Sequence, residues 1–130
     1  MEFDSLSRMV IGYALEVHRE LGPGLLESTY EKCLLHELKS HQVECVTQIG
    51  IPVSYKGINI DCGYRIDILV EERLIVELKS VETLLKKLYA FTLCEVVLNS
   101  SILVLKGGHP VVMNVEDVLR ANTCLLYTSD

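Results

Sequence analysis

Two carboxylates and a lysine that could do chemistry together, Asp67, Glu77 and Lys79, occur in the stretch from Gly63 to Lys79, which reads G-Y-R-I-D-I-L-V-E-E-R-L-I-V-E-L-K. It contains two short apolar runs separated by three charged residues, and this pattern predicts an antiparallel hairpin. With a three-residue loop, Val70 pairs with Leu74, and Asp67 then lies directly opposite Glu77. The Cβ atoms of such a pair lie about 4.5–5.5 Å apart, and Mg²⁺ takes oxygen ligands at about 2.0–2.1 Å. One divalent ion could therefore bridge the two carboxylates.

The hairpin carries its charges on one face. Strand side chains alternate between the two faces of a sheet, so each run has one apolar face and one face with charge. Lys79 falls two residues beyond Glu77 on the charged face. A two-residue loop would set Asp67 opposite an apolar residue and break the match of faces. The pattern therefore favours the register that forms a site, and the alternative is a hairpin whose charged face is merely solvated.

This hairpin resembles the core of the PD-(D/E)XK nuclease superfamily, in which an Asp on one strand is followed by (D/E)-X-K on the next. Asp67 and the segment Glu77-Leu78-Lys79 match these positions. Upstream, residues 24–30, G-L-L-E-S-T-Y, match G-x-x-E-x-x-Y, the signature of a bacterial family placed within that superfamily. Residues 17–23, V-H-R-E-L-G-P, are similar to its lead-in. The resemblance implies a restriction-endonuclease-like α/β fold, with a mixed central sheet flanked by helices.

The resemblance also implies a metal site. Glu27 matches a helix Glu that commonly completes this site in the superfamily. The implied ligands are rich in oxygen and suit Mg²⁺ or Mn²⁺: Glu27, Asp67, Glu77 and the backbone carbonyl of Leu78. Lys79 would position or deprotonate the attacking water, or stabilise the phosphorane by its charge. The alternative for Glu27 is a carboxylate favoured in the first turn of a helix by the macrodipole.

Three further residues are candidates for supporting the site or for contacting substrate. His18 is either a cation at the end of the first helix or a group that supports the site. Tyr30 lies beside Glu27 on the helix surface and either packs in the core or orients that carboxylate. Arg65, opposite Lys79 in the favoured register, either binds phosphate or pairs with a carboxylate.

The reaction implied by the resemblance is metal-dependent hydrolysis of a phosphodiester in nucleic acid, with DNA favoured over RNA. The net charge of −6 argues against tight binding through a basic surface, so binding is expected to be weak and assisted by the metal. Many nucleases of the superfamily act as dimers, which leaves a homodimer open. The alternative is a non-catalytic binding or adaptor module that retains the nuclease fold. It is supported by the acidic composition, by the divergent C-terminal third, and by the lack of any Gln after Gln48, where the family usually carries one.

The remaining pattern supplies elements that could position these residues. Apolar residues at spacings of three and four predict an amphipathic helix over residues 6–21, with Asp4 or Ser5 as its cap, and a second over about 25–40, separated by the Gly22-Pro23-Gly24 break. From residue 43 the alternation predicts strands, with a turn at Lys56-Gly57. A third helix is expected over residues 84–93, with Lys86 and Lys87 on its outside, either solvated or touching a phosphate backbone. Strands are expected at 102–106 and 111–115.

Length and composition indicate one domain over residues 1–130, with 116–130 interpreted as a non-native or disordered tail. The five cysteines include no C-x-x-C and are interpreted as reduced, buried thiols. No signal peptide is recognised at the N-terminus, and no apolar run reaches the ~18 residues that span a bilayer. The expected compartment is the cytoplasm, with no membrane partner.

Overall fold

The computed structural model describes residues 5–22, 26–78, 87, 96, 100–106 and 109–114. Its helices are α1 (Ser5–Leu21) and α2 (Glu27–Ser40). Its strands are β1 (Cys45–Gly50), β2 (Val53–Tyr55), β3 (Ile58–Ile60), β4 (Arg65–Val70), β5 (Leu74–Glu77), β6 (Ser101–Lys106) and β7 (His109–Asn114). Of the predicted third helix, residues 84–93, the structure describes Lys87 alone, and the predicted tail 116–130 lies outside the described residues.

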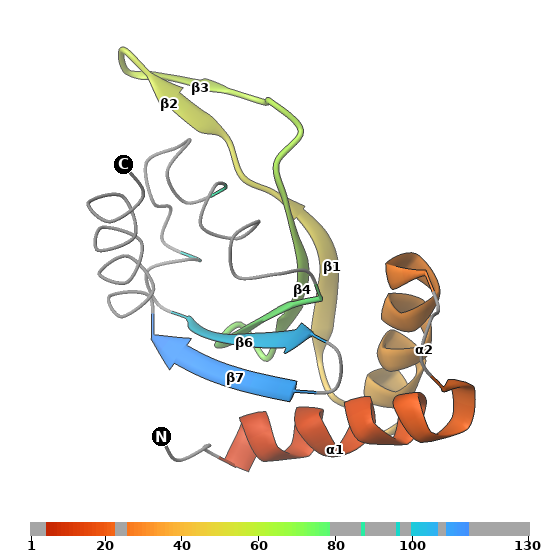
Figure 1. Cartoon of the computed structure of the whole chain (residues 1–130). Coiled ribbons are helices and arrows are strands. Elements are labelled where there is room, and N and C mark those ends of the chain that lie inside the picture. Colours follow the sequence, from red (N-terminus) through yellow and green to blue (C-terminus); the bar gives the residue numbers. More distant parts are fainter. Residues whose placement is uncertain are drawn as a thin grey trace, which may run out of the picture.

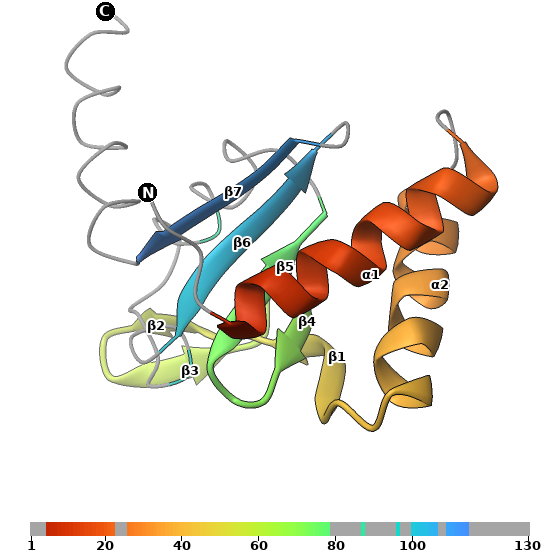
Figure 2. The ribbon, with the colours of Figure 1, turned by 90° about the horizontal axis from the view of Figure 1, so that it is seen from below.

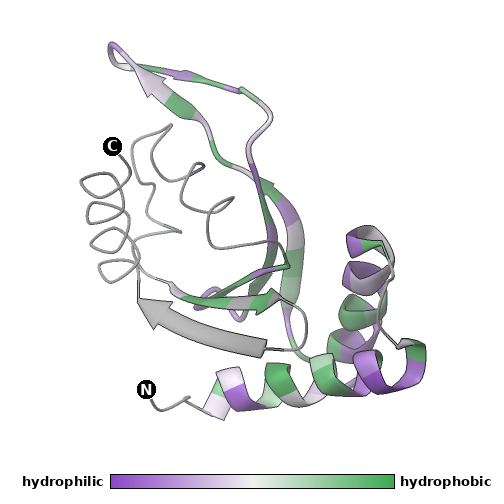
Figure 3. Ribbon diagram, viewed as in Figure 1, coloured by the Kyte–Doolittle hydropathy of each residue, from purple (hydrophilic) through white to green (hydrophobic). Residues whose placement is uncertain are grey.

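Helix α1 ends at Leu21, as its apolar stripe predicts, and begins at Ser5, one residue before that stripe. The buried side chains recur at spacings of three and four, at Leu6, Val10, Ala14 and Val17, and Figure 3 shows hydrophobic positions along this helix. The helix ends at a glycine: Gly22 has φ +75°, and its N–H donates to the carbonyl of His18 at 2.8 Å. Glycine adopts this left-handed conformation at little cost, which is why it commonly follows a helix.

Helix α2 begins at Glu27 rather than at the predicted residue 25. Leu26 is extended, with φ −63° and ψ 142°, and its carbonyl accepts the N–H groups of Thr29 and Tyr30 at 3.1 Å. Leu26 therefore acts as the N-cap, and Glu27 becomes the first helical residue. The prediction placed the start too early because the apolar pattern does not indicate where the backbone becomes helical.

The main sheet has five described strands in the order β1-β4-β5-β6-β7. Strands β5 and β6 are parallel and the other neighbours are antiparallel, so the sheet is mixed. Figure 1 shows that α1 and α2 flank it, which confirms the predicted fold class. Strands β2 and β3 form a separate hairpin at the predicted Lys56-Gly57 turn and extend away from the helices (Figure 1).

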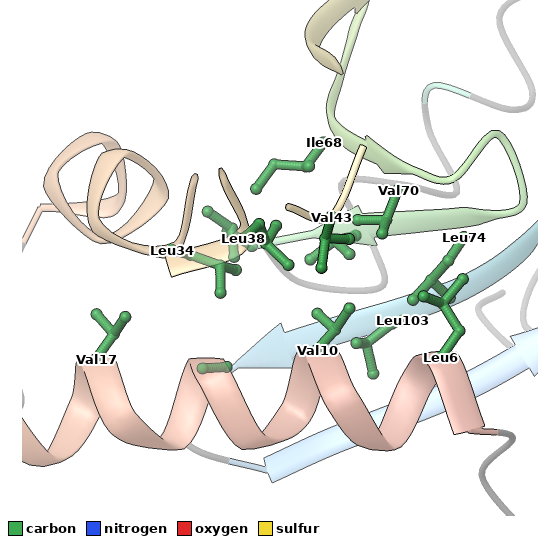
Figure 4. Packing of buried hydrophobic residues seen from close by; sticks show 13 residues of the cluster. Leu6, Val10, Val17, Leu34, Leu38, Val43, Ile68, Val70, Leu74 and Leu103 are labelled. Atoms are coloured by element: carbon green, nitrogen blue, oxygen red, sulfur yellow. The ribbon is translucent and has the colours of Figure 1, made fainter. Parts of the chain in front are cut away.

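The core lies between the two helices and one face of the sheet. In Figure 2, α1 runs across β4 and β5, and Figure 4 shows its apolar side chains opposite those of the strands. Alternate residues of the hairpin contribute to this core, at Ile68, Val70, Leu74 and Val76. Burying each such side chain stabilises the fold by about 1.5–3 kcal/mol. The helices thus hold the hairpin from the face opposite to its carboxylates.

The described cysteines are free thiols, as predicted. Cys33 and Cys45 are partly buried, but Cys62 is exposed, so the prediction that all five are buried is wrong at this position. Cys62 belongs to the connection between β3 and β4, where no element covers it in the described structure. Neither α1 nor α2 is long and apolar enough to cross a membrane.

Candidate metal centre

The register of the β4–β5 hairpin is the one predicted from its loop length. Val70 pairs with Leu74 and Ile68 pairs with Val76. Continuing this register by one pair places Asp67 opposite Glu77, and these two side chains share a hydrogen bond. The alternation of apolar and charged residues thus determined which side chains meet, because a shift by one residue would have exchanged the two faces.

The turn that sets this register is strained. Glu71 and Glu72 have φ of 53° and 55°, and the N–H of Arg73 donates to the carbonyl of Val70 at 3.0 Å. Two successive positive φ values are typical of the type I′ turn, whose backbone twist matches that of an antiparallel hairpin. Glycine or asparagine would occupy these positions more cheaply than glutamate.

The charged face of the hairpin is buried. Asp67 is 7% exposed and Glu77 is fully buried. Their neighbours on this face are also buried and apolar, at Leu69, Ile75 and Ile102. The alternative of a merely solvated charged face is therefore wrong. A carboxylate in such surroundings loses its hydration, and it is stable only with a proton, a hydrogen-bond donor or a cation beside it.

The acidic pair holds a proton. Burial, followed by the hydrogen bond and the negative charge of Asp67, raises the pKa of Glu77 to about 8 against the opposing effect of Lys87. Asp67 is held by the backbone, because its Oδ2 accepts the N–H of Leu78 at 2.9 Å. At neutral pH this raised pKa keeps Glu77 protonated, so the metal-free site carries less negative charge than two ionised carboxylates would.

Lys87 is the cation beside this pair, and the sequence analysis missed its position. Its Nζ lies 2.6 Å from the carbonyl oxygen of Arg65, 3.3 Å from Oε2 of Glu77 and 3.5 Å from Oε1. Its side chain is 11% exposed, so the prediction that it lies on the outside of a helix is wrong. Local periodicity could not reveal this contact, because it joins residues ten and twenty-two positions apart. Lys86 lies outside the described residues.

Arg65 begins β4 and is bound to a carboxylate. Its guanidinium donates to Asp61 at 3.2 and 3.4 Å and to its neighbour's carbonyl, that of Tyr64, at 2.9 Å. The hydrogen bond from Arg65 is the largest cause of a lowered pKa of Asp61. This geometry corresponds to the predicted alternative of pairing with a carboxylate. Lys79, predicted opposite Arg65, lies outside the described residues.

The three predicted residues on the helices have separate surroundings. Glu27 is exposed in the first turn of α2. Tyr30 donates its hydroxyl hydrogen to the carbonyl of Ala14 at 2.8 Å, which joins the two helices, and burial raises its pKa. His18 lies in the last turn of α1 and is partly buried. Among the residues that the structure describes, no group of three or more His, Cys, Asp or Glu could hold a metal. Asp67 and Glu77 are thus brought together without Glu27.

The model of the PD-(D/E)XK nuclease superfamily matches residues 4–94. The chain belongs to this superfamily. The match includes the acidic pair and Lys87, and membership indicates a nuclease-like function with a nucleic-acid substrate. Neither the curated proteins nor the solved structures searched give a match.

Nucleases of the PD-(D/E)XK superfamily generally depend on divalent metal ions, and the donor set here fits such an ion. Mg²⁺ is usually bound by one or two carboxylates together with water and substrate phosphate. Asp67 and Glu77 supply two carboxylates on neighbouring strands. The N–H of Leu78, the residue after Glu77, donates to the Asp67 carboxylate and links the two strands at the site. A hard cation bound here would take the place of the proton that the raised pKa keeps on Glu77.

Proposed function

We propose that the protein is a metal-dependent nuclease that hydrolyses phosphodiester bonds in nucleic acid, with DNA as the favoured substrate. The observation that supports this most directly is the hydrogen-bonded pair of buried carboxylates, Asp67 and Glu77. A structural role for the pair is a poor explanation, because burying two adjacent acids costs stability that apolar residues would not cost. Residues that destabilise a fold in this way are typical of functional sites.

The proposed metal ligands are Asp67, Glu77, the backbone carbonyl of Leu78 and Glu27. The first two are already adjacent, and Leu78 follows Glu77 directly. Glu27 is proposed as the outermost ligand, although α2 packs against the face of the sheet opposite to the pair and the described structure does not bring Glu27 beside it. The ion in this proposal is Mg²⁺ or Mn²⁺, and when bound it activates water and neutralises charge at the phosphorus.

The protein's own residues prepare this chemistry. The N–H of Leu78 orients the Asp67 carboxylate, and the apolar neighbours of the pair keep water away, which strengthens electrostatic interactions in the site. Lys79 is proposed to position the attacking water or to stabilise the transition state, as the E-L-K motif implies. Tyr30, Arg65 and His18 are proposed as supporting groups. Tyr30 would act by joining the two helices, Arg65 by its pairing with Asp61, and His18 from the last turn of α1.

Calorimetric titration of Mn²⁺ into the metal-free protein tests the proposal without a choice of substrate. We expect wild-type protein to bind and Asp67→Asn to lose binding, because asparagine keeps the shape and the acceptor for Leu78 but not the charge. Glu20→Gln is the control, since Glu20 is exposed on α1, and should bind as wild type. Glu27→Gln should weaken binding less than Asp67→Asn if Glu27 is the outermost ligand.

Cleavage of labelled DNA in Mg²⁺, abolished by EDTA and by Asp67→Asn, is the second measurement. Absence of Mn²⁺ binding in the wild type would overturn the nuclease proposal. The protein would then be assigned as a non-catalytic binding or adaptor module that retains the nuclease fold. Mn²⁺ binding without cleavage of DNA, but with cleavage of RNA, would correct the substrate alone.

A further inference from the structure

The ammonium group of Lys87 is anchored more firmly to the backbone than to the acidic pair. Its 2.6 Å contact with the carbonyl oxygen of Arg65 is short, whereas its contacts with the two oxygens of Glu77, at 3.3 and 3.5 Å, are long. Hydrogen bonds between N–H and O are usually about 2.7–3.2 Å long. The backbone carbonyl therefore holds Lys87 beside the pair even when Glu77 turns to another cation.

The N–H donors of the ammonium group are directed at the site. Lysine carries three N–H donors, and within the described residues its acceptors are the carbonyl oxygen of Arg65 and the two carboxylate oxygens of Glu77. Its side chain is nearly buried, so a donor that Glu77 releases would be close to the site and poorly hydrated. A charged donor of this kind binds an anion more strongly than one in open water.

The charges of the proposed site indicate a role for such a donor. Asp67, Glu77 and Glu27 carry three negative charges. One divalent cation and Lys79 together carry three positive charges, which leaves no net attraction for a phosphodiester. Lys87 adds one positive charge, and a phosphodiester carries one negative charge. Arg65 is less available for this purpose, because its guanidinium is already paired with Asp61.

We propose that Lys87 is a substrate-binding residue that holds the scissile phosphodiester beside the Asp67–Glu77 pair. This inference rests on the proposed nuclease function and deepens it. On metal binding, Glu77 turns from Lys87 to the metal, while the carbonyl of Arg65 keeps the ammonium group in place. The freed N–H donors then bind a non-bridging oxygen of the phosphate.

The test compares metal binding with DNA binding in the same variants. Lys87→Met removes the charge and the donors, Lys87→Gln keeps a neutral donor for the carbonyl of Arg65, and Lys87→Arg keeps the charge. The control is Lys32→Met, at an exposed lysine of α2. Mn²⁺ binding is measured by calorimetry. Binding of a fluorescent phosphorothioate DNA duplex, which resists cleavage, is measured by anisotropy in saturating Mn²⁺ at several salt concentrations.

We expect Lys87→Met and Lys87→Gln to bind Mn²⁺ at least as tightly as wild type but to bind the duplex about 10- to 100-fold more weakly. The slope of log K against log salt should fall by about one, as for the loss of one phosphate contact. Lys87→Arg and Lys32→Met should resemble wild type. The glutamine variant serves the test if the methionine variant fails to fold.

Two results would overturn the inference while leaving the nuclease proposal in place. One is duplex binding by Lys87→Gln with the affinity and salt slope of wild type. The other is loss of Mn²⁺ binding in that variant, which would make Lys87 a support for the Glu77 carboxylate rather than a phosphate contact. Failure of the wild type itself to bind Mn²⁺ is a different result, and it would overturn both the proposed function and the inference that rests on it.

Discussion

Glu77→Gln should remove most of the pH dependence of stability between pH 5 and pH 8. The ordinary pKa of this carboxyl is 4.5, and burial in the folded protein raises it to about 8. Below about pH 4.5 both the folded and unfolded states hold the proton, and the full stability is present. Between the two pKa values the unfolded chain releases the proton while the folded protein keeps it. Stability therefore falls as pH rises.

The expected size of this loss is large. Each pH unit between the two pKa values costs about 1.4 kcal/mol, and integration from pH 5 to pH 8 gives a loss of about 3.5 kcal/mol for a folded-state pKa of about 8. The total stability of a domain is typically about 5–15 kcal/mol. Glutamine imitates the protonated acid and can donate a hydrogen bond to Asp67, so the variant should lose none of this stability.

The assay is urea unfolding followed by circular dichroism at pH 5, 6, 7 and 8, with EDTA and constant ionic strength. Groups other than Glu77 titrate in both proteins and cancel in the difference between them. Glu20→Gln, at an exposed position of α1, is the control and should follow wild type. If the free energy of unfolding changed with pH in the same way for wild type and Glu77→Gln, the assignment of a raised pKa to Glu77 would be refuted. Saturating Mn²⁺ should flatten the wild-type profile, because the bound ion replaces the proton.

Three further substitutions test the turn, the helix contact and the core by urea unfolding. Glu72→Gly should stabilise the protein by about 0.5–1 kcal/mol, because glycine removes the strain of a positive φ; a lower stability would contradict the left-handed turn. Tyr30→Phe removes the hydrogen bond to Ala14 and should cost about 1 kcal/mol with unchanged Mn²⁺ binding, whereas lost Mn²⁺ binding would mean that Tyr30 orients a ligand. Leu34→Ala leaves a cavity under α1 and should cost about 2–5 kcal/mol; a cost below 1 kcal/mol would show that the site is loosely packed.

The sequence by itself was sufficient for the features that depend on neighbouring residues. The stripe of α1 and its end at Gly22 follow from helical period and from the conformational freedom of glycine. The pairing of Val70 with Leu74 follows from loop length and from the alternation of faces. The opposition of Asp67 and Glu77 follows from the same two rules, because side chains repeat with a period of two along a strand.

Only the tertiary structure decided how these carboxylates are surrounded. The burial of Glu77, its raised pKa and its contact with Lys87 depend on segments that are distant in the chain. The same holds for β1, which pairs with β4 across the intervening β2–β3 hairpin. Hydrophobic period reports whether a face is apolar, but it does not report what covers a charged face. That depends on long-range packing, whose energy is summed over contacts that no local pattern contains.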